Sequence, residues 1–335
     1  AVDSRKAFRM KSEILHILRS QDGYVSGQEL CERFGVSRTA VWKTINQLKE
    51  EGYEIEAVPN KGYHITACPD VVSAEEVKSL LETRWAGQNI AHFAAVDSTN
   101  NKAKRMAEEG APHGTLVIAD EQTGGRGRRG RSWNTIPGAA IAMTLVIRPE
   151  LPPERASMVT LLMGMAVASG CRELLGLPVG IKWPNDAVLD GKKICGILTE
   201  MSMEMDAINY LVIGTGINVN MDEFPEEISQ VATSLSIHAG HTVNRAEVIC
   251  RCMKYFEQYY EAFAAAGNLS GLKNIYNEML VNRDAEVRVL EPGNEYTGIS
   301  RGINDLGELL VEREDRSVTA VFAGEVSVRG VYGYI

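Results

Sequence analysis

The sequence has little of what marks a secreted or a membrane protein. Its six cysteines include no CxxC pair and are too few for a disulfide framework, which favours a reducing cytosol. The longest apolar stretch, residues 156–170, is too short and too rich in Ser, Thr and Gly to cross a bilayer, and no secretory signal opens the chain. We therefore expect a cytoplasmic protein with no membrane partner.

Positive charge is also scarce. The chain carries 35 Lys and Arg against 44 Asp and Glu, a formal net charge of −9, which excludes a protein that coats nucleic acid with its whole surface. Its 44% of apolar and 24% of charged residues are ordinary for a folded chain. Because 335 residues exceed the roughly 250–300 that one core usually serves, we expect several domains, and any contact with DNA has to be local.

Residues 1–66 have the order of a winged helix-turn-helix domain. Apolar residues at helical spacing predict a first helix, and Ser26 and Ser37 are suited to cap two more helices. Residues 53–58 and 63–65 then alternate between apolar and polar positions around a Pro-Asn-Lys-Gly turn, which predicts a two-stranded wing. Helix, helix, turn, helix and wing is an order typical of DNA-binding domains.

The third predicted helix carries the positive charge of this domain. Residues 37–49 include three basic residues and no acidic one. Side chains off the apolar stripe could reach bases or phosphates in a major groove. The candidate DNA-binding residues are Arg38, Thr39, Lys43, Asn46 and Gln47. We expect Trp42 to be structural and to fill the space beside Val41 and Ile45. The alternative to DNA binding is a solvated helix face in a domain that only packs on its neighbours.

The rest of the chain predicts two further domains after a linker at residues 67–73. Residues 74–280 mix helical and β-rich segments without strict alternation, so an α+β domain on a mixed sheet fits better than a doubly wound fold. Residues 281–335 contain five short β-like segments, which predict a small SH3-like β-barrel. The barrel segments are Glu286–Leu290, Tyr296–Ile303, Leu309–Glu312, Ser317–Phe322 and Glu325–Val328.

The segment Gly125–Arg131 has three Gly and four Arg in seven residues. It satisfies the GxGxxG pattern, but polar residues precede it and Ser-Trp-Asn follows where a dinucleotide site would need a helix. A flexible and positive loop suits closure over a small polyanion. The alternatives are a solvated basic loop or a nucleic-acid contact of the RGG kind.

Four more segments supply groups that could meet this loop. Lys182–Asp186 (KWPND) presents a cation, an amide and a carboxylate at a strand end, and Lys193 leads into an apolar strand, where its charge is worth more than in water. The alternative is that Lys193 only lies at the end of a β-hairpin and has no catalytic role. Gly214 and Gly216 either let a flat ligand approach the backbone or mark a bulge. The segment Asp97–Asn100 either caps the next helix, or its Ser98 and Thr99 hydroxyls bind a ligand at the N-terminus of that helix.

Together these motifs resemble the biotin protein ligases. The resemblance rests on Asp97–Asn100, Gln122 with the GRGRRGR loop, Trp133, KWPND, and the segments Lys193–Ile197 and Gly214–Asn218, in this order and spacing. GRGRRGRxW together with KWPND is highly specific. With the winged helix in front, the chain resembles the bifunctional bacterial type, ligase and repressor of the biotin operon, over essentially all 335 residues.

The resemblance implies a class II synthetase-like catalytic domain and a reaction in two steps. The carboxylate of biotin attacks the α-phosphate of MgATP, which gives biotinyl-5′-AMP and pyrophosphate. A lysine of the biotin carboxyl carrier protein of acetyl-CoA carboxylase then takes the biotinyl group. Because the substrate brings its own nucleophile, the enzyme has only to bring two anions together and stabilise the charge at phosphorus.

The same resemblance implies roles for individual residues. Lys193 and Arg128 would be catalytic. The implied biotin-binding residues are Ser98, Thr99, Asn100, Gln122, Gly125, Arg126, Lys193 and Gly196. The implied adenylate-binding residues are Arg128, Arg131, Trp133, Asn185 and Asn218, with Trp133 stacked on the adenine. Asp186 is the candidate to help place Mg²⁺.

The family also implies regulation. Bound biotinyl-AMP would order the loop and so create a surface for a homodimer, whose two winged helices match the operator DNA of biotin synthesis genes. Three alternatives stay open: a ligase whose winged helix is inert, a repressor whose ligase domain is dead, and a lipoate-type ligase of the same fold.

Overall fold

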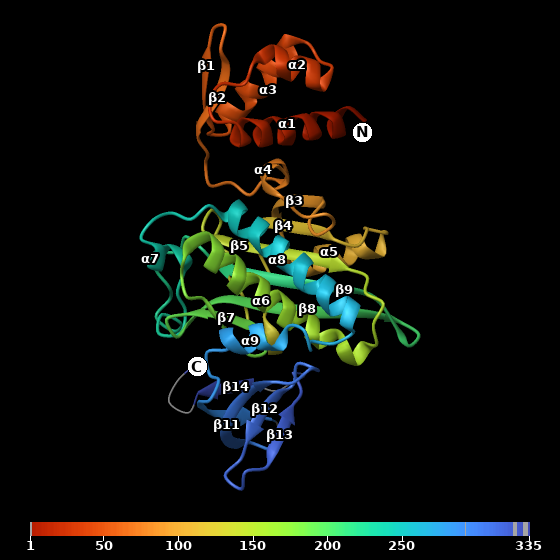
Figure 1. The fold of residues 1–335 in the computed structure, drawn as a ribbon, viewed down its shortest axis with the longest axis vertical. Coiled ribbons are helices and arrows are strands. Elements are labelled where there is room, and N and C mark those ends of the chain that lie inside the picture. Colours follow the sequence, from red (N-terminus) through yellow and green to blue (C-terminus); the bar gives the residue numbers. More distant parts are fainter. Residues whose placement is uncertain (1, 292, 324–326, 331–333) are drawn as a thin grey trace. The chain divides into compact units, whose positions relative to one another are not determined.

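The computed structural model describes residues 2–291, 293–323, 327–330 and 334–335 (Figure 1). The chain forms two compact units, Ala1–Leu81 and Glu82–Ile335.

The first unit has the predicted winged helix-turn-helix order. Its elements are α1 (Val2–Ser20), α2 (Gly27–Phe34), α3 (Arg38–Glu50), β1 (Glu54–Val58), β2 (Gly62–Ala67) and α4 (Ala74–Leu80). The Ser26 hydroxyl accepts a hydrogen bond from the Gln28 N–H, and the Ser37 hydroxyl accepts one from the Ala40 N–H, so both predicted caps are present. Apolar side chains of α1, α2, α3 and β1 close one core.

Helix α4 belongs to this first unit, although we expected it to open the catalytic domain. Its Glu76 is fully buried and accepts hydrogen bonds from the Arg19 guanidinium and the Tyr53 hydroxyl, both at 2.5 Å. A buried carboxylate needs such partners to offset its lost hydration. The units therefore divide after Leu81 rather than before residue 74.

The second unit contains a seven-stranded mixed sheet. Its strands are β3 (Asn89–Val96), β4 (Thr115–Gln122), β5 (Ala140–Ile147), β6 (Gly180–Lys182), β7 (Asp186–Leu189), β8 (Lys192–Glu204) and β9 (Ala207–Asn218). The order across the sheet is β3-β4-β5-β9-β8-β7-β6, in which only the β3–β4 pair is parallel. The predicted α+β class is confirmed.

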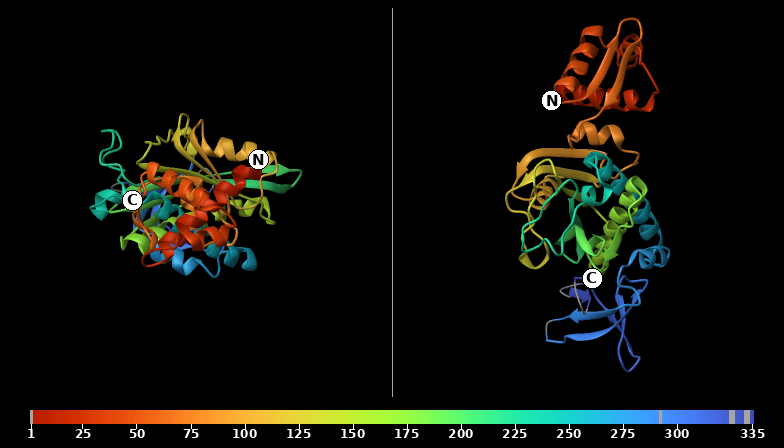
Figure 2. Two further views of the ribbon diagram at one scale, coloured as in Figure 1. Left: turned by 90° about the horizontal axis from the view of Figure 1, so that it is seen from above. Right: turned by 90° about the vertical axis from the view of Figure 1, so that its left-hand side faces the viewer.

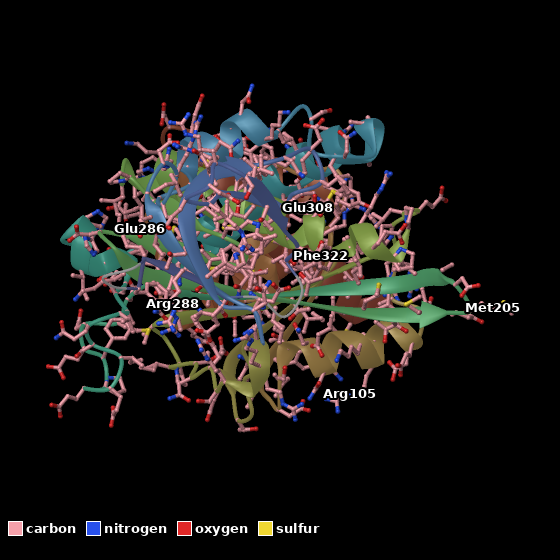
Figure 3. All side chains as sticks on the ribbon, turned by 90° about the horizontal axis from the view of Figure 1, so that it is seen from below. Arg105, Met205, Glu286, Arg288, Glu308 and Phe322 are labelled. Carbon is pink, nitrogen blue, oxygen red and sulfur yellow. The ribbon has the colours of Figure 1, made fainter. Side chains whose placement is uncertain are left out.

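Helices cover this sheet. They are α5 (Thr99–Glu108), α6 (Ala156–Leu175), α7 (Leu235–Ala239), α8 (Arg245–Ala266) and α9 (Lys273–Met279). Helices α6 and α8 pack side by side on one face (Figures 1 and 2). Strands β8 and β9 form a long hairpin, and Met205 at its turn is 93% exposed and points away from the protein (Figure 3).

One helix among the described residues, Pro153–Leu175, is long and apolar enough to cross a membrane, but 72% of its most apolar window is buried in the protein. It packs against α8 and the sheet, which is the position of a core helix.

The carboxyl-terminal part is a five-stranded antiparallel sheet in the order β13-β12-β11-β10-β14. Its strands are β10 (Glu286–Leu290), β11 (Tyr296–Ile303), β12 (Leu309–Glu312), β13 (Val318–Val321) and β14 (Ser327–Gly330). Part of the last predicted segment, Glu325–Val328, lies outside the described residues. The indole N–H of Trp183 donates to the Gly307 carbonyl at 3.0 Å, which ties this small domain to the catalytic sheet.

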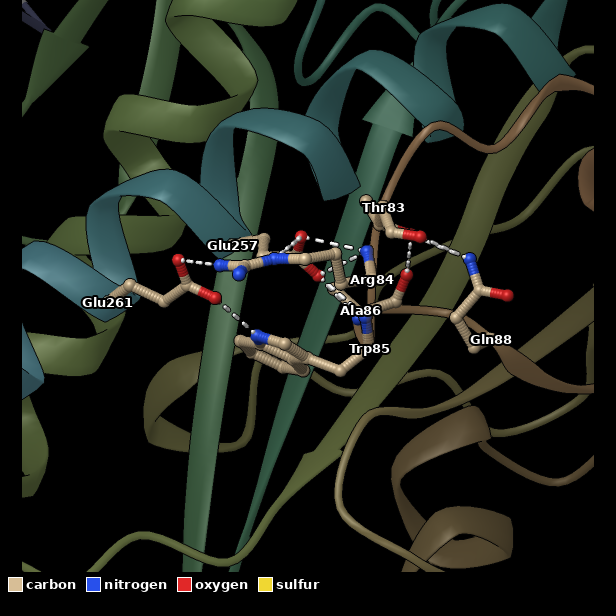
Figure 4. A network of polar contacts seen from close by, with 7 residues as sticks. All are labelled: Thr83, Arg84, Trp85, Ala86, Gln88, Glu257 and Glu261. Carbon is tan, nitrogen blue, oxygen red and sulfur yellow. Dashed lines mark hydrogen bonds and ion pairs between the residues drawn. The ribbon is translucent and has the colours of Figure 1, made fainter.

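The start of the second unit is anchored by one buried carboxylate. Glu257, on α8, accepts hydrogen bonds from the backbone N–H groups of Arg84, Trp85 and Ala86 at 2.8–3.1 Å (Figure 4). Glu261, one turn further on, binds the side chains of Arg84 and Trp85 at the surface.

We expect Glu257→Ala to lower the free energy of unfolding by about 3 kcal/mol, because it leaves three backbone N–H groups without their charged acceptor. Glu261→Ala is the matched control and should cost less than about 1 kcal/mol, since its pair is exposed. Urea unfolding monitored by circular dichroism measures both. Equal losses in the two variants would contradict this role of Glu257.

Candidate active site

The glycine-arginine loop is a compact turn beside the sheet. Arg126 and Ser132 form an isolated β-bridge, and the Gly127 N–H donates to the Arg131 carbonyl at 2.7 Å. Between them Arg129 takes a left-handed conformation, with φ of 57°. No long helix starts here, only a 3₁₀ turn at Arg128–Gly130, so the geometry disfavours a dinucleotide site as the sequence indicated.

A narrow cavity behind this loop gathers the residues implied for biotin. It is lined by Ser98, Thr99, Asn100, Gln122, Arg126, Arg128, Trp133, Asn185, Lys193, Gly196, Gly214 and Gly216, among others. Gly125 is the one residue of the implied set that does not line it. Instead its carbonyl accepts from the Trp133 N–H at 2.9 Å, and a Cβ there would lie 2.3 Å from the Trp133 carbonyl oxygen. Gly125 therefore allows two loop segments to approach each other closely.

The Trp133 indole lines this cavity and lies against two strand glycines. A Cβ on Gly216 would lie 2.4 Å from its indole, and one on Gly196 would lie 3.2 Å from it. Gly216 thus admits a flat group to the backbone, and that group is the protein's own indole, whereas a Cβ on Gly214 would lie 2.2 Å from the side-chain oxygen of Asn100. With the ring in place the cavity measures about 60 Å³, well below the usual 300–1,000 Å³ of ligand pockets.

Hydrogen bonds between protein groups set the far wall of the narrow cavity. The Gln122 side-chain oxygen accepts from the N–H and the hydroxyl of Thr99. The Asn100 amide donates to the Leu198 carbonyl and to Glu200, so it ties α5 to β8. Ser98 is buried at the N-terminus of α5, yet its hydroxyl makes no capping hydrogen bond. Asn100 therefore has a structural role, and the Ser98 hydroxyl does not cap the helix.

A larger cavity of about 520 Å³ lies on the other side of Trp133. It is lined by all five residues implied for the adenylate, which are Arg128, Arg131, Trp133, Asn185 and Asn218. Trp133, Arg128, Asn185 and Lys193 line both cavities, so they stand at the junction. The indole of Trp133 lies between the two cavities and packs against Gly216 of the sheet.

The KWPND segment forms the turn between β6 and β7, with a cis peptide bond at Trp183–Pro184. It brings Lys182 and Asp186 into register, and Asp186 forms an ion pair with Lys193 at 2.7 Å. Burial lowers the pKa of Lys182 to about 8, against the opposing effect of the Asp186 carboxylate. The junction thus holds several cations around one carboxylate.

Arg128 is held by its neighbours at the same place. Its guanidinium donates to the Asn185 side-chain oxygen at 3.0 Å and to the Ala323 carbonyl at 3.3 Å. Burial lowers the pKa of Arg128, and Asp186 partly offsets this shift. A buried guanidinium stays protonated, so it offers a fixed positive charge to an anion that enters.

The lining of the larger cavity includes Lys182, Arg329 and Tyr334, which were not among the predicted site residues. Lys182 belongs to the KWPND motif, so the sequence motif could have identified it as a site residue. Arg329 and Tyr334 carry no local signal, because only the fold brings the end of the chain to this cavity. The described residues include no cluster of three His, Cys, Asp or Glu that could hold a metal ion.

The candidate DNA-binding residues of α3 are on its accessible side. Arg38, Thr39, Lys43 and Gln47 are exposed and Asn46 is half-buried, whereas Val41 and Ile45 are in the core. Trp42 is 58% exposed, so the expectation that it fills the core was wrong. At about 100° per residue, the position after Val41 turns away from the core stripe, which puts this indole on the exposed face with Lys43.

Three family models match the chain. They are an HTH domain over residues 11–64, the biotin/lipoate A/B protein ligase family over residues 92–218 and the biotin protein ligase C-terminal domain over residues 285–329. The fold and the two joined cavities thus define a protein ligase of this class with a helix-turn-helix domain in front.

Relatives that match along nearly the whole chain identify the family within this class. The bifunctional ligase/repressor BirA of Bacillus subtilis is 38% identical over 93% of this chain and 96% of its own. BirA of Escherichia coli is 32% identical over 91% and 92%. The chain belongs to this family of bifunctional biotin ligase/repressors, as the sequence motifs indicated.

A solved structure also supports the membership of this family. The biotin protein ligase from Aquifex aeolicus in complex with biotin and ATP superposes with a TM-score of 0.63 at 30% identity, over 72% of this chain and 99% of that one.

Proposed function

We propose that this protein is an ATP-dependent biotin protein ligase that also represses transcription with its own reaction intermediate, biotinyl-5′-AMP. Biotin occupies the narrow cavity and ATP the larger one. The observation that carries this proposal is the junction, where Lys193 and Arg128 line both cavities. A carboxylate from one side and an α-phosphate from the other meet there among cations.

In the first step the biotin carboxylate oxygen bonds to the α-phosphorus and pyrophosphate leaves. Lys193 and Arg128 lower the repulsion between the two anions and stabilise the extra charge of the transition state. Arg131, Asn185 and Asn218 hold the nucleotide, and Ser98, Thr99, Gln122 and Arg126 hold the biotin ring. Asp186 would help to place a magnesium ion, which would neutralise phosphate charge.

In the second step the amine of a lysine on a biotin carboxyl carrier protein attacks the biotinyl carbonyl, and AMP leaves. Ligase relatives support this acceptor by name, since the Mycobacterium tuberculosis enzyme, 32% identical over 70% of this chain, is a biotin–[acetyl-CoA-carboxylase] ligase. The adenylate accumulates when acceptor is absent. It then favours a homodimer whose two α3 helices bind the two halves of an operator of biotin synthesis genes.

Exchange of labelled pyrophosphate into ATP tests the ligase. Biotin should support exchange, and lipoate at the same concentration should not. Adding a carrier domain should give biotinylated carrier, seen as a mass increase on one lysine. Exchange supported by lipoate alone would overturn the proposed substrate.

Trp133 provides a direct signal of binding. Because its indole lines the narrow cavity and packs against Gly216, we expect biotin binding there to shift the ring and to change the tryptophan fluorescence in proportion to occupancy. Trp133→Phe should abolish most of this change while Trp42→Phe leaves it intact, since Trp42 lies on the other unit. A biotin signal that persists in Trp133→Phe would mean that the indole does not move.

A further inference from the structure

The last residues of the chain reach the nucleotide cavity. The Tyr334 hydroxyl donates a hydrogen bond to Asp186, and the Lys182 ammonium lies 3.5 Å from the centre of the Tyr334 ring. Asp186 is in turn paired with Lys193 at 2.7 Å. One aromatic side chain from the carboxyl terminus therefore contacts both charged groups of the KWPND turn, which comes 148 residues earlier in the chain.

The charge around Tyr334 is strongly positive. Five cations line this cavity against two carboxylates, Asp186 and Glu227; the cations are Arg128, Arg131, Lys182, Lys193 and Arg329. Cations held this close repel one another, and burial makes the repulsion stronger. A hydrogen bond fixes the Asp186 carboxylate, and the electron-rich ring face stabilises the ammonium of Lys182. Both contacts keep the cations in place before any anion arrives.

Tyr334 is part of the wall and does not block the cavity. The free space of about 520 Å³ is present with the side chain in its observed position. That volume lies within the range of small-molecule and cofactor pockets, so a nucleotide does not need to displace the ring.

We propose that Tyr334 is a positioning residue of the nucleotide site, which holds Lys182 and Asp186 in the arrangement that receives a nucleoside triphosphate. The proposal rests on the proposed function in so far as that triphosphate is the ATP of adenylation.

Equilibrium binding of a fluorescent N-methylanthraniloyl derivative of ATP to the full-length protein tests this without turnover. We expect Tyr334→Leu, which loses the ring and the hydroxyl, to raise the Kd by about tenfold, given the usual size of such contacts. Tyr334→Phe keeps the ring on Lys182 and should give a smaller rise. In pyrophosphate exchange the KM for ATP should rise likewise, while the KM for biotin and kcat stay within about twofold.

Tyr296→Leu is the matched control, because Tyr296 also carries a cation on its ring, Arg313 at 3.8 Å, but does not line the cavity. It should leave the Kd unchanged. An unchanged Kd in Tyr334→Leu would overturn the proposal, as would a lower Kd, which would show that the tail competes with the nucleotide. A similar rise in Tyr296→Leu, or loss of biotin affinity in step with ATP affinity, would show a merely structural effect. Absence of biotin-dependent exchange in the wild-type protein would instead refute the proposed function.

Discussion

Lys193→Ala will lower the rate of biotin adenylation by about 10²- to 10³-fold, the usual cost of removing a positioned group that stabilises transition-state charge. Lys193 lines both cavities, and its ammonium is held 2.7 Å from Asp186 at their junction. The variant removes a cation at the point where a carboxylate has to approach a phosphate. Single-turnover formation of biotinyl-5′-AMP from biotin and MgATP measures the effect.

Lys192→Ala is the control for this experiment. Lys192 precedes Lys193 on the same strand, but its ammonium donates to the Ser229 carbonyl at 3.1 Å and it does not line either cavity. We expect its adenylation rate to stay within about threefold of wild type, as for a surface contact. Similar losses in the two variants would mean that charge in this hairpin, and not the position of Lys193, supports the reaction.

The second large effect concerns DNA. Arg38→Ala together with Lys43→Ala should weaken operator binding by the adenylate-bound protein by about 10²-fold, since each group contacting a base or phosphate is worth roughly 1–3 kcal/mol. Both side chains are on the exposed side of α3. Fluorescence anisotropy with operator DNA at fixed salt concentration measures the loss.

The same variant should keep its full adenylation rate, because α3 and both cavities belong to different compact units. Arg9→Ala serves as the control, since Arg9 is an exposed cation of α1 paired with Glu13. A double variant that binds operator as well as the wild type would show that α3 does not carry the contact, and would favour a ligase with an inert winged helix.

Local patterns were sufficient for most of the fold. Serine caps predicted α2 and α3, and the carboxyl-terminal β-like segments predicted β10, β11 and β12 with their observed bounds. The place of α4 was missed because the buried pair between Arg19 and Glu76 joins residues 57 positions apart.

The site was predictable to the extent that its residues stand in motifs. The motif residues around Lys193 line the two cavities, although they stand far apart in the sequence. The position of Trp133 against Gly216 was not predictable, since the sequence shows only that something flat can approach this glycine. Nor was Tyr334, which no motif includes and which only tertiary folding brings to Asp186.

Communication between ligase and repressor requires only that the adenylate bind one state more tightly than the other. Several residues of the Gly125–Arg131 loop, and Trp133, line the two cavities, so a ligand bound there can contact them. Sedimentation should therefore show tighter dimerisation with biotinyl-AMP than without it. Equal monomer–dimer dissociation constants in the two conditions would contradict this coupling between ligase and repressor.

The most direct test of the whole account is fluorescence anisotropy of DNA from upstream of biotin synthesis genes, titrated with the wild-type protein. Three conditions are compared: no ligand, biotin alone, and biotin with MgATP. The account predicts tight binding only with biotin and MgATP, because the protein then makes its own corepressor. Binding that is absent in all three conditions, or equally tight in all three, would contradict it.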